Sequence, residues 1–258
     1  MKELATLVEE YPQYLRTRGE NILREYLQHE ILHIIFTSKY AHQLTFLGGT
    51  CVRLIYGSER FSEDLDFDSK GLAKQDFEAL AGIIKTQLEL LGYEVNLKFV
   101  FKGAFHCSIK FPGLLYHHEL SGHKEAVLFI KLDAENQHFA HSAILVPLQK
   151  FGITTEILAV PKDLLCAQKI AAIMGRKRPK GRDYYDLHFL LQSASPNYDY
   201  LTKRFGVSDA PSLKKLVNDR IATFDFGALA KDVRPFVFRP QLAEVVRDFP
   251  EFWDRTVL

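Results

Sequence analysis

Several residue types that mark particular protein classes are scarce in this chain. Its 258 residues include only three cysteines, Cys51, Cys107 and Cys166, and these stand far apart. They form no CxxC pair and no spacing typical of a disulfide framework. Scattered cysteines of this kind are typical of a protein in a reducing cytosol.

Long hydrophobic runs are missing too. The clearest apolar stretches, residues 126–130 and 143–146, are far shorter than the ~20 residues that a membrane-spanning helix needs. The start of the chain is charged throughout and lacks the apolar core of a signal peptide. We therefore expect a cytoplasmic protein with no membrane partner.

An excess of charge of one sign is also absent. The chain has 33 Lys and Arg against 32 Asp and Glu, a formal net charge of +1, and 47% of its residues are hydrophobic. This balance excludes a disordered chain and a protein that coats nucleic acid by bulk charge. Any binding of nucleic acid must therefore depend on a local basic patch. The length suffices for one large domain or two modest ones.

Helical and strand-like patterns alternate in the first part of the chain. Apolar residues recur with helical spacing over residues 20–43 and 75–91, and residues 51–56 form a shorter helical pattern. Their alternation with strands predicts a mixed α/β or α+β domain. Strands are predicted at residues 44–47, 65–68, 93–101, 104–111 and 126–133.

The character of the sequence changes after Pro161, and we place the boundary between domains near residues 150–160. Only helical patterns follow, and they predict a helical C-terminal domain. We therefore expect a mixed domain with N-terminal helices over residues 1–155 and a helical domain over residues 156–258. The predicted helices of the second domain cover residues 162–174, 183–192, 212–224 and 241–249.

The most informative stretch is FLGGTCVRLIYGSERFSEDLDFD, which covers residues 46–68. Gly48 and Gly49 allow the backbone to pass close to a phosphate, and a helix beginning near Thr50 would direct its N–H groups to the same place. A Gly-Gly pair taken alone is more often an ordinary turn. The helix between strands 44–47 and 65–68 is expected to return the chain so that the two strands are parallel neighbours.

Two carboxylates follow this turn on one strand. Asp64 and Asp66 are two residues apart, so their side chains leave the same face about 7 Å apart. Such alternation alone is more often a solvated strand edge. Beside a phosphate-binding turn, however, carboxylate oxygens suit Mg²⁺ or Mn²⁺ and indicate phosphoryl or nucleotidyl transfer.

A third carboxylate is expected from a neighbouring strand. Asp133 ends the apolar strand at residues 126–133, where it would complete the metal site. A turn-forming aspartate at a strand end is an equally good interpretation of Asp133 taken alone. Glu135, two residues further on, is the alternative third carboxylate.

A basic segment covers residues 162–182. It has seven Lys and Arg against Asp163 alone, a local charge of +6, so the rest of the chain sums to −5. Lys169 lies in an apolar helical stripe, which indicates either a snorkelling side chain or one directed at an anion. The density of charge suits RNA phosphates, although a solvated loop is the plainer interpretation. The candidate RNA-binding residues are Arg176, Lys177, Arg178, Lys180 and Arg182.

This stretch and DLLCAQKIAAIMGRKRPKGRDYYDL resemble motifs of the AbiEii/AbiGii-type toxin family, within the nucleotidyltransferase superfamily. The resemblance spans about residues 23–190. It implies an α+β fold, with a nucleotidyltransferase-like mixed sheet flanked by helices and then a helical C-terminal domain. It also implies Mg²⁺-dependent transfer of NMP from an NTP to an acceptor such as RNA, including the tRNA 3′ end in some relatives. The protein would be the toxin of a toxin–antitoxin or abortive-infection system, with a cognate antitoxin as partner.

The resemblance also implies residue roles. Asp64, Asp66 and Asp133 would bind metal, and these three with Lys169 and Asp183 would be catalytic. Asp183 belongs to an Arg-Asp-x-x-Asp element that begins at Arg182 and ends at Asp186. The residues expected to bind nucleotide are Gly48, Gly49, Thr50, Arg60 and Lys169.

Two other functions stay open at this point. The same site could transfer a phosphoryl group, as a kinase does, or the chain could be a non-catalytic module that binds RNA or protein. Other classes fail on spacing, since the sequence has no GxxxxGK[ST], no GxSxG and no HExxH. The nearest approach to HExxH, His118 to His123, is one residue too long.

Overall fold

The computed structural model describes residues 2–258, which form two compact units. Unit 1 comprises the chain up to Cys51 together with Ser62–Ala159, and unit 2 comprises Val52–Phe61 together with Val160–Leu258. The predicted division after residue 155 lies close to the end of unit 1 at Ala159. The structure differs from the prediction in assigning residues 52–61 to the helical unit.

Long-range pairing explains why residues 52–61 belong to unit 2. Arg60 forms an isolated antiparallel bridge with Val237, and the N–H of Phe61 donates to the carbonyl of Phe236 at 2.9 Å. The rings of Phe61 and Phe238 lie 4.8 Å apart. These partners are far away in the sequence, so no local pattern reveals them.

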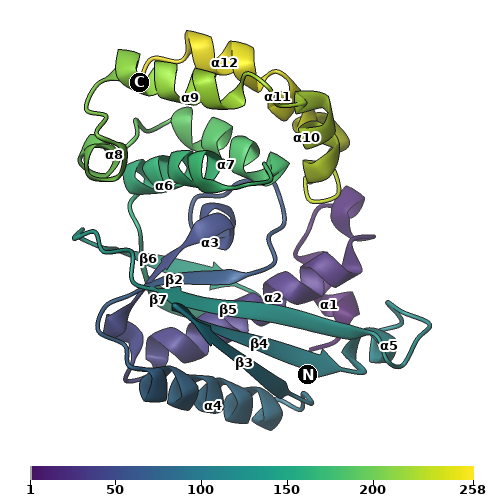
Figure 1. Cartoon of the computed structure of the whole chain (residues 1–258). Helices are drawn as coiled ribbons and strands as arrows, with labels where there is room; N and C mark the ends of the chain where they lie inside the picture. Colours follow the sequence, from purple (N-terminus) through teal and green to yellow (C-terminus); the bar gives the residue numbers. More distant parts are fainter. Residues whose placement is uncertain (1) are drawn as a thin grey trace. The chain divides into compact units, whose positions relative to one another are not determined.

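Unit 1 is built on one seven-stranded mixed sheet, in the order β3-β4-β5-β2-β1-β7-β6 (Figure 1). The β2–β5 and β1–β7 pairs are parallel, and the remaining neighbours are antiparallel. The strands are β1 (Leu44–Leu47), β2 (Leu65–Ser69), β3 (Asn96–Lys102), β4 (Ala104–Pro112), β5 (Val127–Glu135), β6 (Ile144–Lys150) and β7 (Ile153–Ala159).

Two long helices pack on one face of this sheet. The His33 side chain in α2 (Gly19–Thr37) hydrogen-bonds Thr155 in β7 at 2.6 Å. Figure 1 shows α4 (Lys74–Leu90) running along β3 and β4. The ring centroids of Phe77 on α4 and Phe105 on β4 lie 5.5 Å apart. Alternate residues of β4 and β5 point to these helices and are buried, so the other residues form the opposite, more open face. Smaller helices of this unit are α1 (Leu4–Glu9), α5 (Leu114–His117) and the 3-10 turns Gln13–Leu15 and Ala41–Gln43.

The prediction that the two strands around the glycine turn are parallel is wrong. β1 and β2 are antiparallel, and Leu47 at the end of β1 pairs with Asp66. The connection begins with the seven-residue helix α3 (Gly48–Leu54). It returns to the sheet at the same end of the strands from which it left. A parallel pair needs a crossover that carries the chain back to the opposite edge of the sheet. The antiparallel pairing instead brings the glycine turn against the acidic strand.

Unit 2 is helical and has an aromatic core. Tyr184 meets the rings of Phe226 and Phe249 edge to face at 5.2 and 5.1 Å, and Trp253 stacks on Phe249 at 6.1 Å. The predicted helices at residues 162–174, 183–192 and 212–224 are confirmed with small shifts in their bounds. The helices are α6 (Lys162–Gly175), α7 (Gly181–Leu191), α8 (Tyr198–Phe205), α9 (Ala210–Ile221), α10 (Phe226–Val233), α11 (Glu244–Arg247) and α12 (Phe249–Arg255), with a 3-10 turn at Pro240–Ala243.

Aspartate and asparagine caps begin the middle helices of unit 2. Asn197, Asp209 and Asp225 each accept a hydrogen bond from a backbone N–H in the first turn of α8, α9 and α10 respectively. The helix predicted at residues 241–249 is instead a 3-10 turn followed by two short helices, since prolines stand at the start of two of these pieces. Within residues 2–258, no helix is both long and apolar enough to cross a membrane.

Candidate active site

The glycine turn of unit 1 lies directly against the acidic strand. Gly48 has φ +79°, a left-handed conformation that favours glycine, and a Cβ placed on it would lie 2.8 Å from Cγ of Asp66. A side chain at residue 48 would therefore overlap the Asp66 carboxyl group. The turn can approach this carboxylate only because residue 48 is glycine.

Thr50 secures the same turn from inside the unit. The residue is fully buried, and its hydroxyl donates a hydrogen bond to the backbone carbonyl of Asp64. Thr50 thus links the start of α3 to the residue just before β2. The expected contact of its hydroxyl with a phosphate stays a prediction.

The structure brings Asp66 and Asp133 together. They are register partners on the parallel strands β2 and β5, whose backbones lie ~4.8 Å apart, and their side chains leave the same face of the sheet. Glu135 lies two residues further along and pairs with Asp68. Of the two candidates for a third carboxylate, Asp133 is therefore the one beside Asp66.

Asp133 is held by two side chains that the sequence analysis did not identify. Its Oδ1 lies 2.7 Å from Nδ1 of His106 on β4, and its Oδ2 accepts a hydrogen bond from Nζ of Lys131 at 2.9 Å. This hydrogen bond raises the pKa of Lys131 against the effect of burial, and the charges of Asp133, Asp64 and Asp66 raise it further. Three carboxylates therefore act on one ammonium group.

From the sequence pattern, the proximity of Lys131 to Asp133 could be predicted, whereas that of His106 could not. Lys131 and Asp133 are two apart on a predicted strand, so a shared face was readable from the sequence. The pairing of His106 with Asp133 depends on the register of β4 against β5, which no local pattern specifies.

Asp68, the next acidic residue of β2, differs from Asp64 and Asp66. It is buried and accepts a hydrogen bond from the Gln137 N–H at 2.9 Å.

Carboxylate oxygens beside the glycine turn are the kind of donor that a hard divalent cation prefers. Asp64 and Asp66 are partly exposed and suit this role. The two oxygens of Asp133 contact His106 and Lys131. Across residues 2–258, no three His, Cys, Asp or Glu side chains stand together as a ready-made metal cluster. The donor set at Asp64 and Asp66 fits a metal ion, and binding by these two residues and Asp133 stays a prediction.

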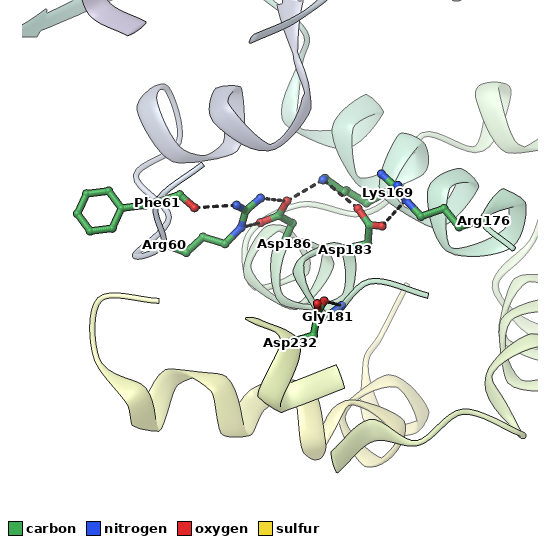
Figure 2. Close-up of polar contacts among 8 residues, drawn as sticks. All are labelled: Arg60, Phe61, Lys169, Arg176, Gly181, Asp183, Asp186 and Asp232. Carbon is green, nitrogen blue, oxygen red and sulfur yellow. Dashed lines mark hydrogen bonds and ion pairs between the residues drawn. The ribbon is translucent and has the colours of Figure 1, made fainter. Parts of the chain in front are cut away.

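A second group of charged residues forms a network inside unit 2 (Figure 2). Arg60 donates from Nε and Nη2 to the two carboxylate oxygens of Asp186, both at 2.6 Å, and from Nη1 to the carbonyl of Phe61 at 3.0 Å. Nζ of Lys169 lies 2.7 Å from Oδ2 of Asp186 and 3.3 Å from Oδ1 of Asp183. Arg176 completes the row, with Nε 2.7 Å from Oδ2 of Asp183.

Charge pairing outweighs burial in this network. Burial alone would raise the pKa of Asp186, but the charges of Arg60 and Lys169 hold it below its usual range. Burial would likewise lower the pKa of Lys169, and the charges of Asp186 and Asp183 raise it instead. The ion pairs therefore stay charged, as a buried network requires.

These contacts bear on the predicted roles of Arg60, Lys169 and Asp183. Arg60 is 1% exposed and each of its guanidinium nitrogens has a protein acceptor, which favours a structural role. Nζ of Lys169 faces the two carboxylates, in a side chain that is 12% exposed. Asp183 lies inside the first turn of α7 and pairs with cations instead of capping the helix. Binding of nucleotide by Arg60 and Lys169, and a catalytic role for Lys169 and Asp183, stay predictions.

The predicted RNA-binding residues differ in their surroundings. Lys177, Arg178 and Lys180 are exposed between α6 and α7. Arg176 pairs with Asp183, and the guanidinium of Arg182 stacks over the ring of Phe236 at 4.5 Å. RNA binding by these five residues stays a prediction.

Comparisons with known proteins address the family and the fold. The family model for "Nucleotidyl transferase AbiEii toxin, Type IV TA system" matches residues 30–250. MenT4, a nucleotidyltransferase toxin from Mycobacterium tuberculosis, has a similar structure (TM-score 0.60, 14% identity, 98% of this chain and 88% of that one). The crystal structure of JHP933 from Helicobacter pylori is also similar (TM-score 0.56, 18% identity, 91% and 90%). No curated protein sequence matches the chain.

Proposed function

Because the chain belongs to the AbiEii family of nucleotidyltransferase toxins, we propose that it transfers NMP from an NTP to an RNA acceptor in a Mg²⁺- or Mn²⁺-dependent reaction. An RNA hydroxyl oxygen bonds to the α-phosphorus, and pyrophosphate leaves. The 3′ end of tRNA is the first acceptor to test. The toxin of a type IV toxin–antitoxin system has an antitoxin partner, and we place the activity in the cytoplasm. The fold, shared with a nucleotidyltransferase toxin, supports this proposal.

The observation that carries the proposal is the close approach of Gly48 to Asp66, with Asp133 in register on the next strand. A turn free of side chains would allow phosphate oxygens to approach the backbone N–H groups of Gly48 and Gly49. Phosphoryl-group chemistry needs charge neutralisation and positioning. A metal ion held by the carboxylates would supply the first, and the glycine turn beside them would supply the second.

Each residue of this edge has a defined task in the proposal. Asp64 and Asp66 would hold the metal ion, which when bound neutralises charge on the triphosphate oxygens. Asp133 would orient the acceptor hydroxyl or accept its proton, while His106 and Lys131 fix the direction of its two oxygens. Thr50 keeps the turn in place through the Asp64 carbonyl.

Lys169 and Asp183 are proposed as catalytic residues on the strength of the family motif. Lys169 would then bind a phosphate in exchange for one of its two carboxylate partners. Asp183 would help to position it. Arg60 and Asp186 would have a structural role and keep Lys169 in position, because they form a buried ion pair with each other.

Transfer of label distinguishes this activity from its alternatives. The purified protein is incubated with each NTP in turn, labelled at the α or the γ phosphate, together with tRNA or total RNA and with Mg²⁺, Mn²⁺ or EDTA. We expect RNA to acquire label only from the α position and only with metal present. Asp66→Asn should abolish the transfer, whereas Glu135→Gln, which alters an exposed carboxylate on β5, should preserve it.

Other outcomes would support the competing functions. Label that moves only from the γ phosphate would identify a phosphotransferase. Absence of both NTP binding and transfer, with Asp66→Asn indistinguishable from the wild type in growth inhibition, would identify a non-catalytic module.

A further inference from the structure

The open face of β3, β4 and β5 carries exposed side chains that have no role in the proposed reaction. On β5 the burial alternates, so that Leu128, Ile130 and Leu132 point to the helices while Val127 and Phe129 are exposed. Phe129 has 49% of its surface exposed. A large aromatic side chain held in this way on a regular strand is available for contact with a partner.

The register of the three strands arranges this face in rows that lead away from Asp133. In the first row, Asp133 is flanked by His106 on β4 and Val100 on β3. Each further row lies about 7 Å along the strands. The second row is Lys131, Ser108 and Lys98, and the third is Phe129, Lys110 and Asn96.

The second and third rows, which we call the basic rows, combine positive charge with an aromatic ring. Their six residues include three lysines, and the other three are neutral. Lys98 and Phe129 are exposed, and Lys110 is partly exposed. Lysines interleaved with an exposed aromatic on a sheet surface suit phosphates and unpaired bases respectively.

We infer that the basic rows bind a single-stranded RNA segment whose end lies at Asp133. This inference rests on the proposed function and adds a location for the acceptor strand. Lys98 and Lys110 contact phosphates, and a base stacks on Phe129. Lys131 connects the basic rows to the carboxylates, because it belongs to the second row and also donates a hydrogen bond to Asp133.

A single strand fits this surface better than a duplex does. The bases of a duplex are stacked inside the helix, so the ring of Phe129 could contribute only if the RNA is unpaired. Lysine contacts alone would bind either form. Stacking on Phe129 therefore predicts a preference for unpaired RNA that charge alone would not produce.

RNA binding is measured without NTP and in EDTA, so that it does not depend on the reaction. The probe is a fluorescent RNA of about 12 unpaired nucleotides, and the same strand annealed to its complement is the duplex. Phe129→Ala and Phe129→Leu should each weaken single-strand binding roughly tenfold, and the wild type should prefer the single strand. Tyr14→Ala, which removes an aromatic ring that is 52% exposed on the short turn Gln13–Leu15, is the matched control and should change nothing.

The charge contribution is measured through salt dependence. Lys98→Ala combined with Lys110→Ala should lower the slope of log K against log salt by about 1.4, since each phosphate contact on a single strand contributes ~0.7. Lys85→Ala on α4 is the control lysine and should leave the slope unchanged. The combined change Lys177→Ala and Arg178→Ala tests the exposed loop between α6 and α7 as the competing site.

The results separate this inference from the proposed function. Loss of binding in the loop variant alone, equal affinity for the duplex, or no RNA binding at all would overturn the inference. If label is still transferred from α-labelled NTP in any of these cases, the proposed function stands without it. Binding on the basic rows with no transfer of label would leave the inference standing and overturn the proposed function.

Discussion

Gly48 shows how one residue can decide whether a turn is able to lie against a carboxylate. Its left-handed backbone and its contact with Asp66 each require glycine, and the second requirement is the informative one. Gly71 provides a comparison, because it also has a positive φ of +73° but no atom within 4 Å of an added Cβ.

We predict that Gly48→Ala loses transferase activity while Gly71→Ala keeps it. Both variants incur the strain of a left-handed alanine, about 1–2 kcal/mol, which should lower both melting temperatures, and the overlap with Asp66 should lower that of Gly48→Ala further. Only Gly48→Ala also displaces the Asp66 carboxylate. Activity and melting temperature measured on both variants check this, and equal activity in the two would show that the close approach to Asp66 is unimportant.

Asp186 is the residue on which the buried network of unit 2 depends. We predict that Asp186→Ala lowers the free energy of unfolding by at least about 3–5 kcal/mol, because it leaves Arg60 and Lys169 without their shared carboxylate. Urea unfolding measures the change. Asp219→Ala, at an exposed position of α9, serves as the control and should cost less than about 1 kcal/mol.

The lowered pKa of Asp186 also predicts a pH dependence. Its carboxylate is stabilised by Arg60 and Lys169 against burial, so the stability that it contributes is complete above the unfolded-state pKa of about 3.9. That contribution is lost as the pH falls below about 4 and through the lower folded-state pKa. Unfolding curves at a series of pH values should show this loss in the wild type, and the same slope in Asp186→Asn would contradict the assignment.

At the scale of elements, α7 shows how a helix start is fixed by a distant residue. The N–H of Gly181 donates to Oδ2 of Asp232 on α10 at 2.8 Å, which Figure 2 displays, and an added Cβ at Gly181 would overlap the backbone carbonyl of Leu229. The close packing of α7 and α10 therefore depends on glycine at residue 181.

We predict that Gly181→Ala destabilises unit 2 even though alanine favours helices. The overlap with the Leu229 carbonyl forces α7 and α10 apart, at a cost of roughly 1–3 kcal/mol that exceeds the ~1 kcal/mol gain in helix propensity. Gly82→Ala within α4 meets no atoms within 4 Å and needs no left-handed backbone, so it is the control for the gain in helix propensity alone and should raise the melting temperature. A rise in the melting temperature of Gly181→Ala would show that the helices can separate freely.

Elements with a strong local pattern were predictable from the sequence, and their partners were not. The strand at Leu44–Leu47 and the helices α6 and α9 follow from apolar periodicity and breaker residues. The β6–β7 hairpin was missed, because β6 is largely exposed and contains Pro147, features that suit an edge strand but weaken its pattern. The antiparallel pairing of β1 with β2 depends on where the connection ends, which local sequence does not encode.

The same distinction applies to the candidate site. Asp64 and Asp66 were readable because they are close together in the sequence and follow a glycine turn. His106 came from a strand whose register was unknown, and Asp232 from a helix that the sequence analysis did not predict. The sequence left Lys169 as either a snorkelling lysine or one directed at an anion, and it did not identify Asp183 and Asp186 as its carboxylate partners.

For the whole molecule, the net charge of +1 conceals an uneven distribution. Acidic residues meet at the edge formed by Asp64, Asp66 and Asp133, while positive charge lies on the open sheet face and on the loop between α6 and α7. Each unit has its own core and its own charged centre. The proposed transfer of NMP from an NTP to RNA would use both kinds of surface, one for the metal and one for the polyanion.

The proposed nucleotidyl transfer depends on the carboxylates beside the glycine turn. The most direct test is transfer of label from α-labelled against γ-labelled NTP to RNA, measured for the wild type, Asp66→Asn and Glu135→Gln. We predict metal-dependent label from the α position in the wild type and Glu135→Gln, and none in Asp66→Asn. Transfer from the γ position alone, or undiminished transfer by Asp66→Asn, would contradict it.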